Sequence, residues 1–198
     1  ETTGELGVNT IHAAASSASI SALPDGSYAV GYSVRRAGMW ALSISLEGEP
    51  INRAPFAVAV SAADLHPLAC DVAGQLHSVI AGSEAQVEVR ARDRYGNRLR
   101  CSGGDLSITL LAMDDAAAPP VEGSFIDHQD GRYSSTYRCM SAGRHALSIT
   151  HGDGEALYGS PFLLQVAAAP ACADQCVVRP LRTHRPTVIT PAWVRVHP

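Results

Sequence analysis

The chain repeats itself at a spacing of about 105 residues. Asp25–Tyr28 reads Asp-Gly-Ser-Tyr, and Asp130–Tyr133, which lies 105 positions later, reads Asp-Gly-Arg-Tyr. At the same offset, Ala41–Ser45 matches Ala146–Thr150. Further matches are Gly38 with Gly143, and Pro55–Phe56 with Pro161–Phe162 at an offset of 106. Because the matches keep their order along the chain, the sequence predicts tandem copies of one structural unit.

Short runs that alternate between apolar and polar residues lie between the turn residues. Val87–Arg92 alternates in this way, and so does Leu106–Leu110. A period of two places alternate side chains on opposite faces of a strand. The 17 glycines and 12 prolines are spread along all 198 residues, which is typical of many short strands joined by turns. We therefore predict an all-β fold of tandem, immunoglobulin-like β-sandwich repeats, each with about seven strands.

The offsets divide the chain into one complete unit and two partial ones. Residues 63–168 hold a full set of predicted strands, including a third strand at Leu106–Met113 and a fourth within Val121–His128. Residues 1–62 lack room for the first two strands, and residues 169–198 are predicted to be a linker followed by the opening strands of a further unit. A partial sandwich exposes an unpaired edge, so we expect the chain to be a piece of a longer array. The alternative is that the end fragments complete one another between molecules.

The motifs of the complete unit, taken together, resemble the filamin-type immunoglobulin-like repeat. The residues that carry this resemblance are Asp93–Asn97 (Asp-Arg-Tyr-Gly-Asn), Gly103–Asp105, Asp130–Tyr133, Gly143 and Gly159–Phe162. Two positions depart from the pattern. Ala54 stands where a serine usually precedes Pro-Phe, and Ser135 stands where an apolar residue such as Val30 is expected. The resemblance implies a seven-stranded sandwich without the disulfide of antibody domains.

The resemblance also implies that the repeats are not catalytic and act as spacers and protein-binding modules. Some repeats of this type bind a partner by adding a peptide strand beside the third strand, over the groove toward the fourth, since an edge strand offers free backbone donors and acceptors. The alternative is that this edge is covered by a neighbour or is solvated. The corresponding partner-binding residues are Leu106, Ser107, Ile108, Thr109, Leu110, Leu111, Gly123, Ser124 and Phe125.

Composition argues against several other functions. The net charge of −4 gives no basic footprint for nucleic acid, and the sequence has no stretch of 18 uninterrupted apolar residues that could insert into a membrane. Cys172 and Cys176 with His184 fall short of the four ligands of a structural zinc site. We expect no metal, no cofactor, no small-molecule substrate and no enzymatic activity, and we expect protein partners within a larger assembly.

The cysteines bear on the location of the protein. There are five, at Cys70, Cys101, Cys139, Cys172 and Cys176, and an odd number is no disulfide framework by itself. None of the three asparagines is followed by x-Ser/Thr, so the sequence has no glycosylation acceptor. Both features favour a reducing, cytoplasmic setting. The predicted function is a spacer and docking segment of a larger cytoskeletal or ciliary protein, for example an axonemal dynein heavy chain. The alternative is an extracellular cell-surface or gamete adhesion protein.

Overall fold

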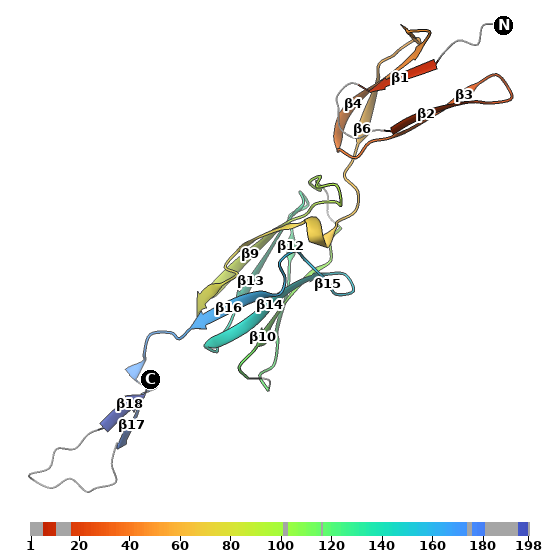
Figure 1. Ribbon diagram of the computed structural model, residues 1–198. Helices are drawn as coiled ribbons and strands as arrows, with labels where there is room; N and C mark the ends of the chain where they lie inside the picture. The colour runs from red at the N-terminus through yellow and green to blue at the C-terminus, as the bar shows by residue number, and fades with distance from the viewer. Residues whose placement is uncertain are drawn as a thin grey trace, which may run out of the picture.

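A computed structural model describes residues 6–10, 17–100, 103–115, 117–173, 176–180 and 194–197. The elements of this part of the chain are β-strands, together with one short 3-10 helix at Pro67–Ala69. The predicted all-β fold is confirmed. Three groups of strands follow one another along the length of the molecule (Figure 1). We refer to them as the first group (β1–β6), the central sandwich (β7–β16) and the third group (β17–β18).

The first group has two small sheets. In one, β4 pairs with β1, β5 and β6, and in the other β2 pairs with β3. The strands are β1 Leu6–Thr10, β2 Ser17–Ala22, β3 Tyr28–Ser33, β4 Gly38–Leu46, β5 Glu49–Pro50 and β6 Phe56–Val60.

The central sandwich consists of two sheets that pack face to face. One sheet has the strand order β11-β10-β14-β16-β8, with β15 paired to β14, and the other has the order β12-β13-β9-β7. All pairs are antiparallel except β16 with β8. The strands are β7 Asp71–Gly74, β8 Ser78–Ile80, β9 Glu84–Arg90, β10 Leu106–Ala112, β11 Val121–Ser124, β12 Ile126–Asp127, β13 Arg132–Arg138, β14 Gly143–His151, β15 Glu155–Ala156 and β16 Phe162–Ala167.

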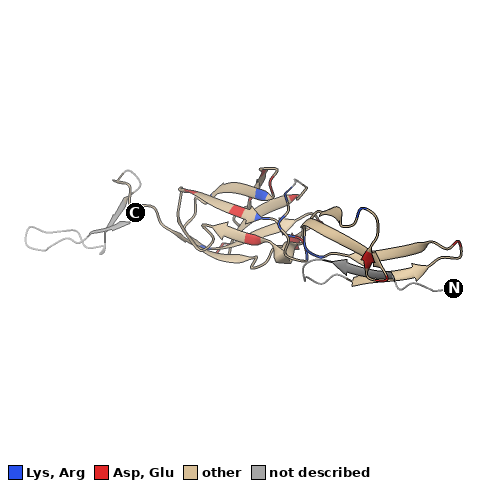
Figure 2. Ribbon diagram, turned by 90° about the horizontal axis from the view of Figure 1, so that it is seen from above, with Lys and Arg blue, Asp and Glu red and all other residues tan. Residues whose placement is uncertain are grey.

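The core of the central sandwich follows from the alternating pattern of its strands. Along β9, Ala85, Val87 and Val89 are buried, while the residues between them face outward. Apolar residues from both sheets meet in one cluster that also includes Tyr133 and Leu147. Few of the strand residues are charged, and Figure 2 shows most of the ribbon as neither acidic nor basic. Burial of apolar surface therefore supplies most of the stabilisation of this unit.

Residues 105 apart occupy equivalent strand positions in the first group and the central sandwich. Tyr28 pairs with Ala22, and Tyr133 pairs with Asp127, so both partners are shifted by the same offset. Their burial differs, since Tyr28 is 45% exposed and Tyr133 only 1%. The reason is that β9 covers the second edge of β13, whereas no strand among the described residues pairs with the second edge of β3.

The third group consists of β17 (Val177–Pro180) and β18 (Val194–His197), which pair antiparallel. Val178 of β17 pairs with Val196 of β18, and in the central sandwich Val72 of β7 pairs with Val89 of β9. Val178 lies 106 positions after Val72, and Val196 lies 107 positions after Val89, so the two pairs have corresponding registers. No sheet of the described residues takes strands from more than one group. The division of the chain at 62/63 and at 168/169 stays a prediction.

A 3-10 turn at Pro67–Ala69 precedes the first strand of the central sandwich, and β7 begins at Asp71. The turn is favoured by Pro67, because proline at the start of a helical turn has no amide donor to lose. The fourth strand was expected as one element, but it is divided into β11 and β12, which belong to different sheets.

Leu110 and Leu111 provide a test of the inward and outward faces of β10. Leu110 is 2% exposed and Leu111 is 46% exposed. We predict that Leu110→Lys destabilises the central sandwich by at least about 3 kcal/mol, because it removes a packed side chain and buries a charge. Leu111→Lys is the matched control and is expected to change stability by less than about 0.5 kcal/mol. Urea unfolding of both variants measures the difference, and equal effects would contradict this placement of the strand.

Candidate functional site

The residues predicted to form a free edge lie mostly on β10, and β10 is not an edge strand. One side of β10 pairs with β14 from Leu106 to Ala112. The other side pairs with β11, from Ser107 opposite Ser124 to Leu110 opposite Val121. The expectation that the third strand offers its free backbone to a partner is therefore wrong over these residues. The chain's own fourth strand already occupies that side.

The side chains of the predicted site divide between the two faces of the sheet. Leu106, Ile108 and Leu110 are buried in the core at 2–4% exposure. Ser107 faces outward, where its hydroxyl hydrogen-bonds that of Thr150 on β14 at 2.8 Å. Thr109 is half-buried and Leu111 is exposed. Only the outward residues of β10 could contact a partner without unfolding the core.

Gly123, Ser124 and Phe125 lie where the chain crosses from one sheet to the other. A Cβ at Gly123 would lie 3.0 Å from Cγ2 of Ile108, so the close approach of β11 to β10 favours glycine there. Phe125 is half-buried and packs against the core. After Ser124 the chain leaves the sheet of β10 and continues as β12 beside β13. These three residues therefore make the crossover itself.

Ser135 explains how the crossover is held. This serine on β13 is 3% exposed, and its hydroxyl donates a hydrogen bond of 2.9 Å to the carbonyl oxygen of Ser124. The sequence marked Ser135 only as a polar residue at an apolar position. Its role depends on a contact with a residue 11 positions earlier, and no pattern in the sequence reports that contact.

The outer edge of this sheet is formed by β11 instead. Val121 on β11 is 39% exposed. Three further apolar side chains on neighbouring segments are exposed: Leu111 at 46% near the end of β10, Met113 at 53% just after β10, and Ile126 at 66% on β12 of the other sheet. We call these four residues the β11 rim. A terminal strand with an apolar rim can pair with an added strand and receive apolar side chains, although four residues allow only a short pairing.

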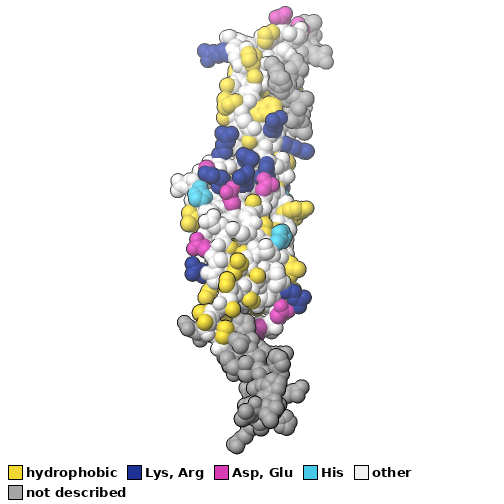
Figure 3. Space-filling view, turned by 90° about the vertical axis from the view of Figure 1, so that its left-hand side faces the viewer, with side chains coloured by type: hydrophobic (Ala, Val, Ile, Leu, Met, Phe, Trp, Pro, Cys, Tyr) yellow, Lys and Arg dark blue, Asp and Glu magenta, His cyan; other side chains and the backbone are white. Residues whose placement is uncertain are grey.

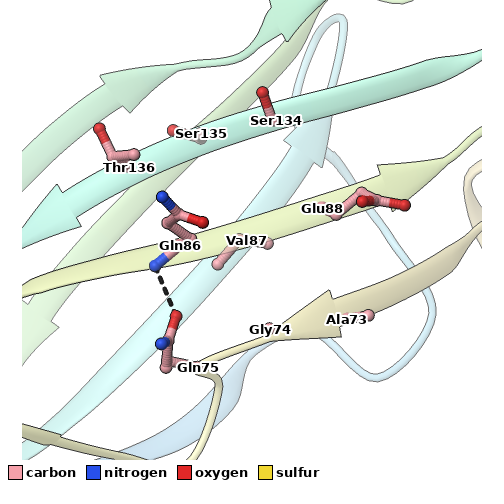
Figure 4. A pocket seen from close by; sticks show the side chains of 9 residues that line it. All are labelled: Ala73, Gly74, Gln75, Gln86, Val87, Glu88, Ser134, Ser135 and Thr136. Atoms are coloured by element: carbon pink, nitrogen blue, oxygen red, sulfur yellow. Dashed lines mark hydrogen bonds between the residues drawn. The ribbon is translucent and has the colours of Figure 1, made fainter.

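An open depression lies on the outer face of the other sheet, across β7, β9 and β13 (Figure 4). It has a volume of about 510 Å³, and one end is closed by the side chain of Gln75, whose Oε1 accepts a hydrogen bond of 2.6 Å from the Gln86 amide. Glu88 is its one charged lining residue, and the hydrogen bond from Arg90 holds the pKa of that carboxyl below its usual value. One lining hydroxyl, that of Ser134, is hydrogen-bonded to Nε2 of His128 at 2.8 Å, at the exposed face of β13. The lining residues are Ala73, Gly74, Gln75, Gln86, Val87, Glu88, Ser134, Ser135 and Thr136.

One cysteine and one histidine do lie together, but inside the core. Sγ of Cys139 is 3.3 Å from Nε2 of His145, and the two residues are 2% and 4% exposed. A thiol beside an imidazole is a nucleophile–base pair only where a substrate can reach it. Here the contact joins β14 to the end of β13 and satisfies two buried polar groups, which is a structural role.

Within residues 17–173, apart from the masked positions between them, no three His, Cys, Asp or Glu side chains lie close enough to hold a metal ion. No helix of the described segments is long and apolar enough to cross a bilayer. Cys101 and His184 lie outside the described residues.

Two packed antiparallel sheets with this strand order define an immunoglobulin-like β-sandwich. The family model of the Filamin/ABP280 repeat matches residues 64–163, which is half of the chain. The chain therefore belongs to the filamin repeat family, whose fold is a non-catalytic structural and protein-interaction domain.

Curated relatives share this segment rather than their whole length. The chain is 33% identical over 101 residues to elongation factor G 2 of Treponema pallidum, covering 50% of this chain and 14% of that protein. It is 26% identical over 146 residues to filamin-C of Rattus norvegicus, covering 73% of this chain and 5% of filamin-C. Among solved structures, the Escherichia coli adhesin FdeC matches 98% of this chain and 61% of that chain, with a TM-score of 0.60 and 22% identity. At that identity the last match shows the fold alone.

The crossover can be tested through Ser135. We predict that Ser135→Ala lowers the free energy of unfolding by about 1 kcal/mol, because the carbonyl of Ser124 loses its donor in a partly buried place. Ser134→Ala is the matched control, since that hydroxyl meets His128 at the exposed face of the same strand. Urea unfolding and amide exchange at β11 and β12 measure the change. If Ser135→Ala destabilises the protein no more than Ser134→Ala does, Ser135 does not hold the crossover as assigned.

Proposed function

We propose that the chain is a structural and protein-interaction segment of a larger cytoskeletal protein. Its repeats hold binding surfaces at a set spacing, and the β11 rim is the docking surface. Two observations support this proposal: the filamin repeat family, and the exposed apolar side chain of Val121 on the terminal strand β11, with Leu111, Met113 and Ile126 exposed on neighbouring segments. The β11 rim carries the proposal, because solvent-exposed apolar groups at a sheet edge favour an added strand. A ciliary setting, such as an axonemal dynein heavy chain, is its finer form and rests on the Ala- and Arg-rich composition alone.

The mode of binding is strand addition beside β11, in place of the pairing expected beside β10. A peptide strand there would lengthen the sheet β11-β10-β14-β16-β8 by one strand. Backbone hydrogen bonds would supply affinity, and apolar residues at alternate peptide positions would contact the β11 rim. Since β11 has four residues, we expect modest affinity unless the peptide also reaches the side chains of Leu111 and Ile126.

Peptides selected from a random phage-displayed library on the immobilised chain test the docking surface. We predict that selected peptides alternate apolar and polar residues and shift the amide resonances of β11. Val121→Lys is expected to weaken binding at least about tenfold by placing a charge on the rim, without a change in melting temperature. Leu163→Lys, at a 58% exposed position on β16, is the matched control and should bind normally. Peptides that map to another edge, or that tolerate Val121→Lys, would refute the site.

The second candidate function is extracellular adhesion, which is suggested by the similarity of fold to the adhesin FdeC. The cysteines discriminate between the two. Cys70, Cys139, Cys172 and Cys176 are all unpaired, with Cys70 and Cys139 buried and Cys172 exposed. Free thiols are the rule in reducing compartments and the exception outside the cell, so the cysteines favour the cytoskeletal proposal.

Thiol titration of the native protein gives the corresponding prediction. After denaturation without reductant, we expect all five cysteines to react. In the folded protein we expect Cys172 to be alkylated quickly and Cys70 slowly, because Cys70 is buried and burial raises the pKa of its thiol. Mass spectrometry of the alkylated peptides identifies each site. A disulfide in protein isolated from its native source would favour adhesion.

A further inference from the structure

The turn at Asp93–Asn97 holds itself together around one buried carboxylate. Asp93 is 1% exposed, and its Oδ1 accepts hydrogen bonds of 2.9 Å from the backbone amides of Tyr95 and Asn97. Its Oδ2 accepts a bond of 2.8 Å from Nδ2 of Asn97. The carboxylate therefore fixes both the path of the turn and the orientation of the Asn97 side chain. Gly96, at φ +81°, supplies the left-handed position that the turn requires.

The oriented amide of Asn97 binds the first group, 60 residues earlier in the chain. Its Nδ2 donates a hydrogen bond of 2.7 Å to the carbonyl oxygen of Arg35, and its Oδ1 accepts one of 2.9 Å from the amide of Ala37. Both residues lie in the loop between β3 and β4. The Asn97 side chain thus binds one backbone donor, at Ala37, and one backbone acceptor, at Arg35, in the neighbouring unit. Two hydrogen bonds restrict rotation between the two units more than a single bond would.

The same turn also holds the connecting segment. Oδ2 of Asp93 accepts a hydrogen bond of 3.0 Å from the amide of Ala63, and the amide of His66 donates one of 2.8 Å to the carbonyl of Arg92. Leu65 forms an isolated bridge with Asp93. The connecting segment is therefore held by Arg92 and by the Asp93–Asn97 turn that follows it, and the same turn contacts the first group.

A cation–π contact adds to this junction. The guanidinium of Arg35 lies over the ring of Tyr95, 5.8 Å from its centroid. In Figure 3, arginines gather where the first group meets the central sandwich. Burial alone would raise the pKa of Asp93, but the hydrogen bonds from Asn97, Ala63 and Tyr95 outweigh burial and hold that pKa below its usual value. The carboxylate thus stays ionised at neutral pH, and its contribution would be lost only as the pH falls through the lowered pKa.

We infer that the Asp93–Asn97 turn is a docking surface for the β3–β4 loop of the adjacent filamin-type repeat, and that Asn97 locks the two units into one rigid body. This inference rests on the proposed spacer function and names the contact that would keep neighbouring repeats in a fixed orientation. The contacts of Asn97 on the partner loop are to backbone groups only. The chemistry of the partner is therefore a loop that presents a carbonyl oxygen and, two residues later, a free amide N–H.

Residual dipolar couplings of the whole chain test the lock directly. In the unaltered protein, we expect one alignment tensor to fit the amides of both the first group and the central sandwich. Asn97→Ala should require two tensors, and the Ala37 amide should exchange at least about tenfold faster. Asn52→Ala, an exposed asparagine in the first group, is the matched control and should keep one tensor.

A second variant covers the case in which Asn97→Ala disturbs the turn itself. Ala37→Pro removes the amide donor from the other side and leaves Asp93 and Asn97 in place, so it should also give two tensors. Two tensors in the unaltered protein, or one tensor in both variants, would overturn the inference. Peptide binding at the β11 rim is measured separately, so loss of the lock with normal peptide binding separates this inference from the docking proposal.

Discussion

The central sandwich depends on the pairing of β9 with β13, which extends over seven residue pairs from Arg132–Arg90 to Arg138–Glu84. This pairing buries Tyr133 at 1% exposure and Tyr137 at 7%. The polar ends of both rings are satisfied, since the hydroxyl of Tyr133 accepts a bond from the Gly104 amide and that of Tyr137 donates to the Gln75 carbonyl. Burial raises the pKa of Tyr137 to about 12, so its phenol remains protonated and can donate this hydrogen bond. In the first group, β3 has no such partner among the described residues, and Tyr28 and Tyr32 are each 45% exposed.

Both lateral edges of the sandwich are closed by segments that change sheets. At one edge, β7 pairs with β9 in one sheet, and the chain then crosses over so that β8 pairs with β16 in the other sheet. At the other edge, β11 pairs with β10, and the chain then crosses over so that β12 pairs with β13. Each half is short, which leaves few free backbone groups in a row and limits uncontrolled pairing with other chains. A partner that binds by strand addition must therefore use a short edge and gain selectivity from side chains. Under the proposed function, the exposed residues of the β11 rim would make such contacts, and the shortness of β11 would favour reversible binding.

The sequence predicted the features that depend on local pattern and missed those that depend on distant contacts. The offset of 105 placed Tyr28 and Tyr133 at equivalent strand positions, and alternation assigned Ile108 to the inner face of β10. It could not show that the fourth strand changes sheets, because the alternation within Val121–His128 is compatible with pairing on either side. It also gave Ser78–Ile80 no signal, since three residues are too few to establish a period. For the same reason the predicted site included Gly123 and Ser124 of β11 but treated the β10 backbone beside them as free.

The Asp93–Asn97 motif shows how one sequence signal can carry two structural roles. As a turn it was predictable, because glycine and asparagine favour its backbone conformation. Its second role was not, because the acceptor and donor it meets are backbone groups of Arg35 and Ala37, which every non-proline residue possesses. The hydrogen bonds of Asn97 contact backbone alone and do not constrain the side chains of the neighbouring repeat, and only the contact of Tyr95 with Arg35 involves a side chain of that loop. The surfaces of successive repeats can then diverge toward different partners while their relative orientation is kept, and the β11 rim, which shares no residue with the lock, is free to do so.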